Sequence, residues 1–310
     1  MKTPLKFVPV TKQIIWGGTR LAREYGKGEP GEKIAESWEL TSREDGDNVI
    51  SGGEYDGKLF SEYLEENPDA VGTKYDGDRF PLLIKLIDAE ADLSIQVHPD
   101  DKYAKAHTTD LGKTEMWYIV DATEGAHIIY GMKEKYPRGV IEKAIQDGTL
   151  EELMNYVPVK KGETYFIPSG TVHAICRGIL IAEIQQNSNI TYRVYDYNRR
   201  QPDGSLRKLH IEDALNVIEN VDPTAVPYEK GGDVIAKCRY FTVHKYENEV
   251  RELFAGDESF IHLLNVDGFA TVLCGGAAYR LVKGKGLFIP AGLGAFTLDA
   301  CGANVIASEL

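Results

Sequence analysis

Short runs of β-branched and aromatic residues, separated by glycine, proline and aspartate, recur along most of this chain. They include LSIQVHP, EMWYIVD, AHIIYGM, TYFIPSG, ITYRVYDY, FIHLLNVDG, GLFIPAG and NVIASEL. Short runs with evenly spaced turns are typical of the strands of β-sandwiches and barrels. The pattern therefore predicts a mainly β fold.

Helical periodicity is confined to three segments, residues 59–67, 136–156 and 211–219. Apolar residues recur there at intervals of three and four, as on one face of an α-helix. We expect these helices to lie at the periphery of the strands. The segment from Glu44 to Gly57 is rich in acidic residues and glycine, which predicts loop and hairpin.

Two segments share one skeleton, namely Gly, five residues, Pro, one residue, Gly and two residues. Residues 162–173 read GETYFIPSGTVH and residues 284–295 read GKGLFIPAGLGA. A glycine turn, a short apolar strand and a Pro-Gly turn place the residue that follows at a fixed point. That residue is His173 in the first segment and Ala295 in the second. We infer two related barrels, of which the second lacks a metal-ligating histidine at this position.

A proline- and glycine-containing segment near Pro223 to Asp233 divides a longer N-terminal part from a compact all-strand part. The predicted domains are residues 1–225, which bind the metal and carry helical decorations, and residues 226–310, which lack metal ligands.

The composition excludes several classes of function. A net charge of −13 opposes binding to nucleic-acid phosphates, although a locally basic pocket can still hold a small anion. No apolar run is long enough to cross a bilayer, and the N-terminus lacks a secretion signal, so we expect a cytoplasmic protein without membrane contact. The four cysteines show no CxxC spacing, which gives no indication of a disulfide framework or a thiolate zinc site.

Four polar residues of the N-terminal part form a candidate metal site. Gln96 and His98 are two apart on an extended run, so they face the same side. Glu115 and His173, each beside a predicted strand, complete a nitrogen and oxygen donor set that suits zinc with an open water position; iron or manganese also fits. Taken singly, each of the four is more typical of a strand end or a surface position.

The same residues stand in segments that resemble a known family. The Gly-x5-Pro-x-Gly-x2-His element is similar to a cupin motif. KFVPVTKQIIWGG, PLLIKLIDAEADLSIQVHPDD, GKTEMWYI and NSNITYRVYDYNR resemble the compact bacterial form of type I mannose-6-phosphate isomerase. The resemblance implies two cupin-like (jelly-roll) barrels and an aldose-ketose isomerase. Such an enzyme interconverts mannose 6-phosphate and fructose 6-phosphate, its small-molecule partner, through an enediolate.

The resemblance also implies roles for individual residues. One zinc ion per chain is held by His98, Glu115 and His173, with Gln96 or water as a fourth ligand. Arg193 matches the catalytic arginine of the family. The residues that match substrate contacts are Lys85, Lys113 and Ser94.

Two of these positions can also be argued without the resemblance. An unpaired ammonium is costly inside an apolar strand, so we expect Lys85 to face a cavity or an anion. The structural alternative for Arg193 is an ion pair with Asp196 or Glu183.

One departure from the family pattern is visible. Asn189 stands four residues before Arg193, where the family commonly has aspartate, so no carboxylate role is inferred there. Two other functions stay open from the residues alone, a non-catalytic sugar-phosphate-binding cupin and a metal cupin oxygenase. The oxygenase would leave Lys85, Lys113 and Ser94 unexplained. The base that moves the proton is not identified by the sequence.

Overall fold

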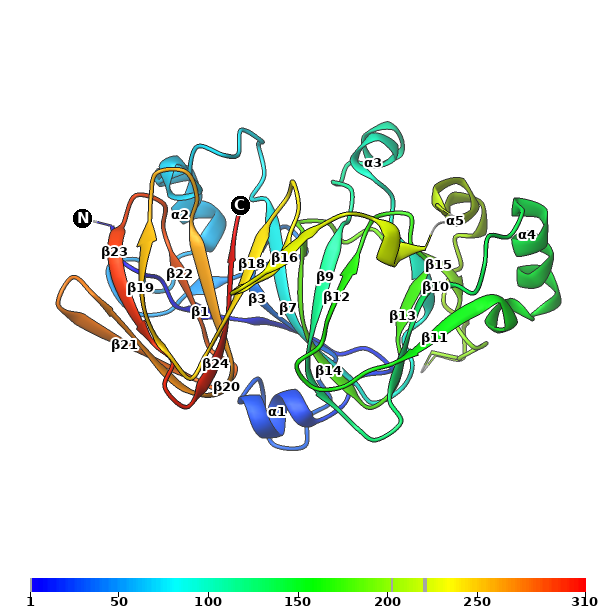
Figure 1. Ribbon diagram of the computed structural model, residues 1–310, viewed down its shortest axis with the longest axis horizontal. Helices are drawn as coiled ribbons and strands as arrows, with labels where there is room; N and C mark the ends of the chain where they lie inside the picture. The colour runs from blue at the N-terminus through cyan, green and yellow to red at the C-terminus, as the bar shows by residue number, and fades with distance from the viewer. Residues whose placement is uncertain (1, 202, 220–221) are drawn as a thin grey trace. The chain divides into compact units, whose positions relative to one another are not determined.

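The computed structural model describes residues 2–201, 203–219 and 222–310, and these form a mainly β protein (Figure 1). The predicted fold class, cupin-like barrels with a few peripheral helices, is confirmed. Contacts group the described residues into two compact units. The first unit comprises residues 2–12, 19–86 and 228–310, and the second comprises residues 13–18 and the described part of 87–227.

The second unit contains a five-stranded antiparallel sheet in the order β11-β10-β13-β8-β15 and the three neighbouring strands β12-β9-β14. Its strands are β8 (Ile95–Val97), β9 (Glu115–Ala122), β10 (His127–Met132), β11 (Met154–Pro158), β12 (Thr164–Ile167), β13 (His173–Ile175), β14 (Ile179–Gln186) and β15 (Tyr192–Tyr195). Its helices are α3 (Asp101–His107), α4 (Arg138–Asp147) and α5 (Ile211–Val217), with 3-10 turns at Leu150–Leu153 and Pro223–Ala225.

The five-stranded sheet has an apolar face and a polar face. Ile95, Val97, Ala174 and Val194 pack in one buried cluster with residues of α4 and α5, which therefore cover the apolar face. Because side chains alternate along a strand, the residues between these, such as Gln96, point the opposite way. The polar face is thus turned away from the helices.

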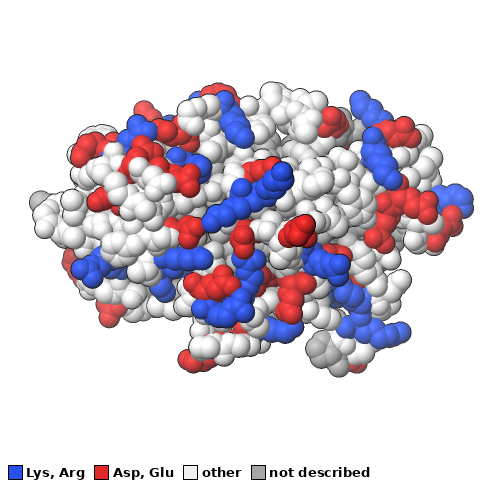
Figure 2. Space-filling model, turned by 60° about the horizontal axis from the view of Figure 1, so that its bottom comes forward, with Lys and Arg blue, Asp and Glu red and all other residues white. Residues whose placement is uncertain are grey.

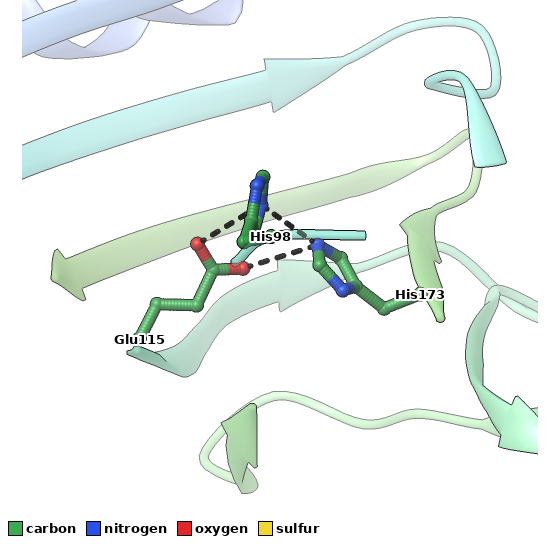
Figure 3. Close-up of side chains that lie close together, drawn as sticks. All are labelled: His98, Glu115 and His173. Atoms are coloured by element: carbon green, nitrogen blue, oxygen red, sulfur yellow. Dashed lines mark hydrogen bonds and ion pairs between the residues drawn. The ribbon is translucent and has the colours of Figure 1, made fainter. Parts of the chain in front are cut away.

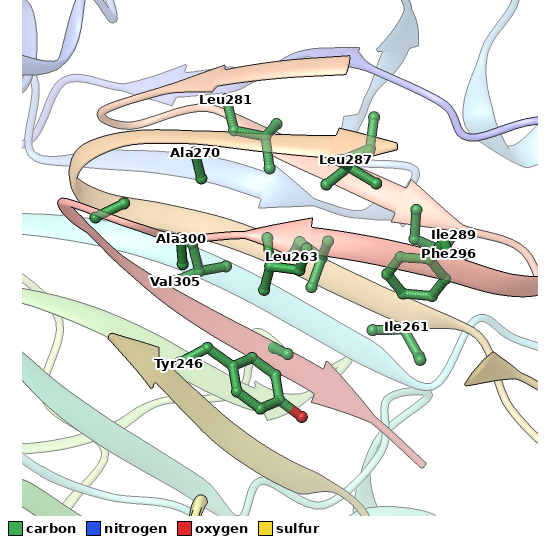
Figure 4. Close-up of a cluster of buried hydrophobic side chains, with 14 of the residues drawn as sticks. Tyr246, Ile261, Leu263, Ala270, Leu281, Leu287, Ile289, Phe296, Ala300 and Val305 are labelled. Carbon is green, nitrogen blue, oxygen red and sulfur yellow. The ribbon is translucent and has the colours of Figure 1, made fainter. Parts of the chain in front are cut away.

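In the first unit, the strands of the C-terminal part follow the order β16-β17-β18-β24-β20-β23-β19, with β21 and β22 also paired to β20. They are β16 (Glu229–Gly231), β17 (Val234–Lys237), β18 (Thr242–Glu247), β19 (Val250–Ala255), β20 (Ile261–Cys274), β21 (Ala277–Val282), β22 (Gly286–Ile289), β23 (Gly294–Asp299) and β24 (Ala303–Glu309). The long strand β20 pairs with β22 through its first half and with β21 through its second. The core between these strands holds Leu263, Leu287, Phe296 and Val305 (Figure 4).

The N-terminal part of the first unit consists of short elements. They are β1 (Phe7–Val8), β2 (Val10–Lys12), α1 (Arg20–Tyr25), β3 (Glu36–Leu40), β4 (Ser42–Arg43), β5 (Gly46–Asp47), β6 (Val49–Ile50), α2 (Phe60–Glu66) and a 3-10 turn at Pro68–Ala70. Strand β7 (Leu82–Ala89) begins in the first unit and ends in the second.

The repeated skeleton is a repeat in structure as well. Strand β12 of the first segment corresponds to β22 of the second, and Gly170 and Gly292 both adopt positive φ, 82° and 74°. The backbone N–H that follows each glycine donates to the proline carbonyl, at 3.2 Å in both turns. The outcomes differ at the last position, because His173 is buried and Ala295 is exposed.

The predicted helices are found, with one difference. Helix α2 and helix α5 lie within the predicted segments, but the helix expected over 136–156 ends at Asp147. Gly148, in the left-handed conformation, caps α4, and after a 3-10 turn the chain continues as strand β11. Helices α1 and α3 were not predicted.

On the face shown in Figure 2, basic and acidic side chains of the described residues are interspersed. In the part of the chain that the structure describes, no helix is long and apolar enough to cross a membrane.

Candidate metal centre

A row of four side chains crosses the polar face of the five-stranded sheet. Tyr130 pairs with His173, His173 with Gln96, and Gln96 with Arg193. Residues directly opposite each other on antiparallel strands project to the same face. The register of β10, β13, β8 and β15 therefore brings three of the predicted site residues together although they are far apart in sequence.

Glu115 reaches the same point from strand β9. It stands opposite Ile167 of β12 and Gln185 of β14. The carboxylate atom Oε1 lies 3.4 Å from His173 Nε2, and Oε2 lies 3.7 Å from His98 Nε2 (Figure 3). Glu115 therefore faces the polar side of the five-stranded sheet.

His98, Glu115 and His173 converge as predicted. The two imidazole Nε2 atoms are 3.2 Å apart, and one ligand atom from each of the three residues lies within 4.8 Å of the others. All three side chains are buried. Two imidazole nitrogens and a carboxylate are donors that divalent transition metals prefer, so the residues fit a metal ion.

Both histidines are oriented by backbone carbonyl groups. His98 Nδ1 lies 2.7 Å from Ile190 O, and His173 Nδ1 lies 2.9 Å from Thr171 O. A carbonyl only accepts, so each Nδ1 carries the hydrogen and each Nε2 presents its lone pair toward Glu115. Burial, with the nearby Lys113 ammonium, lowers the pKa of His173 to about 4, which keeps the ring in the neutral form that binds metals.

Gln96 lies beside the three residues and has a different contact. Its Nε2 is 3.4 Å from His173 Nε2, and its Oε1 accepts a hydrogen bond from Ser94 Oγ at 3.4 Å. Ligation through the amide oxygen would require the opposite orientation of this amide. Ser94, predicted as a substrate contact, thus bonds to the candidate fourth ligand.

Lys113 is buried against two of the candidate ligands. Its Nζ lies 2.7 Å from Glu115 Oε2 and 3.0 Å from His98 Nε2. A third neighbour is Glu183 Oε1, at 4.0 Å. The ammonium therefore balances the negative charge of a buried carboxylate that would otherwise be costly.

Sequence reasoning did not assign a site role to Glu183. This buried carboxylate accepts a hydrogen bond from Trp117 Nε1 at 3.0 Å and lies near Lys113. The available signal was an acidic residue within the apolar run LIAEIQQ. Such a residue is rarely buried without a partner.

Arg193 lies on the row described above, next to Gln96. Asp196, one of the two partners that a structural role would give Arg193, accepts hydrogen bonds from Arg199 and, at 3.3 Å, from Arg207. Asn189 is exposed, and its backbone N–H donates to Asp110 Oδ2 at 3.1 Å.

Lys85 belongs to the first unit, and its contacts there meet the expectation of an anion. Its Nζ lies 3.5 Å from Glu36 Oε2 and 5.5 Å from the centre of the Trp38 ring. This ion pair explains a lysine inside the buried strand β7.

Comparison with known proteins shows similarity to one family of sugar-phosphate isomerases along the chain. Residues 5–126 match the family model of the phosphomannose isomerase type I catalytic domain, and residues 233–309 match that of the mannose-6-phosphate isomerase cupin domain. The chain is 39% identical over 315 residues to a curated mannose-6-phosphate isomerase of Bacillus subtilis strain 168, with 99% of both chains covered. It is 35% identical to the mannose-6-phosphate isomerase of Streptococcus mutans, covering 100% of this chain and 99% of the relative.

Solved structures show the same likeness. The crystal structure of a mannose 6-phosphate isomerase from Bacillus subtilis superposes with a TM-score of 0.89 at 37% identity, over 99% of both chains. A putative mannosephosphate isomerase from Archaeoglobus fulgidus shares the fold, with a TM-score of 0.80 at 20% identity over 99% of this chain and 97% of that one.

Proposed function

Because the chain belongs to the type I phosphomannose isomerase family, we propose that it interconverts mannose 6-phosphate and fructose 6-phosphate at the centre formed by His98, Glu115 and His173. The observation that carries this proposal is the convergence of two imidazoles and one carboxylate in a buried site. The full-length similarity to mannose-6-phosphate isomerases supports the substrate.

We propose zinc as the metal, one ion per chain, held by His98, Glu115 and His173 with Gln96 or water in the fourth position. Nitrogen and oxygen ligands with one open position are typical of catalytic zinc. Metal analysis of the purified protein tests this, and an equimolar content of iron or manganese instead of zinc would contradict it.

The isomerisation moves a proton from C2 to C1 of the open-chain sugar and passes through an enediolate. A divalent ion at this centre would stabilise the negative charge that develops on O1 and O2. We assign Arg193 to the same developing charge, because a guanidinium stays protonated and its strand position places it beside Gln96. Lys113, Ser94 and Lys85 are proposed to bind the sugar phosphate.

The decisive experiment is a coupled assay with mannose 6-phosphate, before and after removal of the metal with a chelator. We expect turnover that the chelator abolishes and added Zn²⁺ restores. Turnover that survives complete metal removal would contradict the metal centre. Binding of the substrate without turnover would favour a non-catalytic sugar-phosphate-binding protein, which the asparagine at position 189 keeps as an alternative.

The proposed domain division, residues 1–225 and 226–310, assigns every proposed ligand and substrate contact to the N-terminal part. Limited proteolysis tests this division, because cleavage should concentrate between residues 223 and 233. The proposed location is the cytoplasm.

A further inference from the structure

The imidazole of His98 depends on a turn that contributes no proposed ligand. This turn, residues 186–190, begins at the last residue of β14 and leads toward β15, and its Ile190 provides the carbonyl that accepts the Nδ1 hydrogen of His98 at 2.7 Å. A displacement of this carbonyl would release the imidazole from the tautomer that presents Nε2 to a metal. The geometry of the turn is therefore part of the metal centre.

The side chain of Gln185 forms hydrogen bonds to the backbone of this turn. Gln185 is fully buried, and its Nε2 donates to Gln186 O at 2.7 Å and to Ser188 O at 2.6 Å. Both hydrogens of the amide are thus used on backbone carbonyls of the turn. Because an amide nitrogen has only two hydrogens, Gln185 has no donor left for a substrate or for another residue.

The turn is also fixed to the strand that carries Glu115. Gln186 accepts a hydrogen bond at Oε1 from the backbone N–H of Thr114, at 2.9 Å, and its own N–H donates to Thr114 O at 3.1 Å. Ser188 Oγ donates to Leu111 O at 2.7 Å. The two bonds with Thr114 connect the turn to the residue that immediately precedes the proposed ligand Glu115.

Gln185 itself stands directly opposite Glu115 in the register of β9 and β14. Gln185 therefore lies beside the proposed carboxylate ligand, Glu115. It also bonds to the turn whose carbonyl orients the proposed ligand His98. We infer that Gln185 is a positioning residue of the metal centre, which acts through the carbonyl of Ile190 on the orientation and tautomer of His98. This inference rests on the proposed role of His98 as a ligand.

The chain offers a matched control in the other unit. Asn265 is also fully buried, and its Nδ2 also donates to two backbone carbonyls, Gly268 O at 3.0 Å and Leu281 O at 2.7 Å. Loss of either amide removes two hydrogen bonds to backbone carbonyls. A general loss of stability should therefore be similar in Gln185→Met and Asn265→Leu, whereas an effect on His98 should be specific to the first.

The test compares the full-length protein with these two variants. Long-range proton–nitrogen NMR of the ¹⁵N-histidine-labelled, metal-free protein should show His98 as a fixed Nδ1–H tautomer in the parent and in Asn265→Leu. In Gln185→Met we expect a mixture of tautomers. The dissociation constant for Zn²⁺, measured by competition with a chelator, should rise about 10- to 100-fold in Gln185→Met. This is the range known for substitution of residues that orient metal ligands without binding the metal. It should stay near the parent value in Asn265→Leu.

An unchanged His98 tautomer together with an unchanged Zn²⁺ affinity in Gln185→Met would overturn the inference, and so would equal changes in both variants. If Gln185→Met does not fold, Ser188→Ala decides through the same two measurements, because it removes the bond that Ser188 Oγ donates to Leu111 O and the bond that it accepts from Ile190 N at 3.4 Å. The tautomer is measured without metal or substrate, so a parent protein that fails to isomerise mannose 6-phosphate would contradict the proposed function alone.

Discussion

The three candidate ligands are held in two different ways. His98 and His173 are oriented by backbone carbonyls, whereas the charge of Glu115 is balanced by the ammonium of Lys113 at 2.7 Å. The carbonyl groups fix the orientation of the two imidazole rings, and the buried ammonium compensates the negative charge of the carboxylate. A substitution of Glu115 that removes only its negative charge should therefore lower the metal affinity while the geometry of the site changes little.

We expect Glu115→Gln to weaken Zn²⁺ binding by more than about 100-fold, beyond the loss typical of residues behind the ligands. The variant keeps the shape of the side chain and removes its negative charge. Competition with a chelator measures the affinity, and Glu183→Gln, an equally buried acid 4.0 Å from the same lysine, is the control. Similar losses in both variants would show that the total negative charge near Lys113, and not ligation by Glu115, determines metal affinity.

Arg193→Ala should lower turnover by about 100-fold or more, as does the removal of one group that stabilises developing charge. Because Arg193 is not a proposed ligand, the metal content of the purified variant should equal that of the parent. Arg193→Lys retains a positive charge and should recover part of the loss. If metal content and turnover fall together in Arg193→Ala, the arginine has a structural role.

The sequence predicted the convergence of His98, Glu115 and His173, because period-two spacing and the Gly-Pro-Gly skeleton are local features. It could not predict the contacts that orient them. The bond from His98 to Ile190 O spans 92 positions, and the approach of Lys113 to Glu183 depends on the pairing of β9 with β14. Such long-range contacts require the sheet register, which short motifs do not determine.

At the scale of elements, local signals explain both the correct predictions and the wrong one. The helix expected over 136–156 stops at Gly148, whose left-handed conformation is a common helix end. Asp100 is the N-cap of helix α3, and its side chain accepts a hydrogen bond from Tyr103 N at 2.7 Å, but among the described residues of this helix only Ala104 is buried. A helix with so small an apolar face produces almost no hydrophobic periodicity.

The turn before His173 allows a test of the repeated skeleton. Gly170 has a φ of 82°, and an added Cβ would lie 2.7 Å from Glu219 Cγ. Gly170→Ala should therefore lower the free energy of unfolding by about 1–2 kcal/mol, the strain of a left-handed L-residue. It should also weaken Zn²⁺ binding, because His173 follows three residues later.

The second copy of the skeleton provides the control. Gly292 has a φ of 74°, and a Cβ there would lie 2.8 Å from Asp257 Oδ1. Gly292→Ala should lose similar stability in urea unfolding and keep the Zn²⁺ affinity of the parent. Equal affinities in the two variants would show that the turn does not set the position of His173.

For the whole molecule, the two copies of the skeleton show how one framework serves two purposes. Glu115 stands opposite Ile167 in the first copy, and Ile261 stands opposite Ile289 in the second. Ile261 therefore occupies the position that corresponds to Glu115, and Ala295 the position that corresponds to His173. The second copy therefore has apolar residues in place of two proposed metal ligands, and one of them, Ile261, belongs to a hydrophobic core.

That C-terminal part nevertheless retains a buried histidine, His262 of β20. Both ring nitrogens lack a hydrogen-bond partner among the described residues. Burial, with the nearby Lys27 ammonium, lowers the pKa of His262 from 6.5 to about 3. A buried polar group without a partner destabilises a fold by about 1–3 kcal/mol, so His262→Leu should raise the free energy of unfolding at neutral pH by a similar amount.

The same substitution should change the response of the protein to acid. Below pH 6.5 the unfolded chain takes up a proton at His262 that the folded chain excludes until about pH 3. The free energy of unfolding therefore falls as the pH decreases through this window, by up to about 1.4 kcal/mol per pH unit from this one group. Urea unfolding at a series of pH values should show a smaller acid loss in His262→Leu than in the parent. Val266→Ala, a cavity variant in the same strand, should lower stability equally at every pH, and an acid loss in His262→Leu as steep as that of the parent would contradict the assignment of this loss to His262.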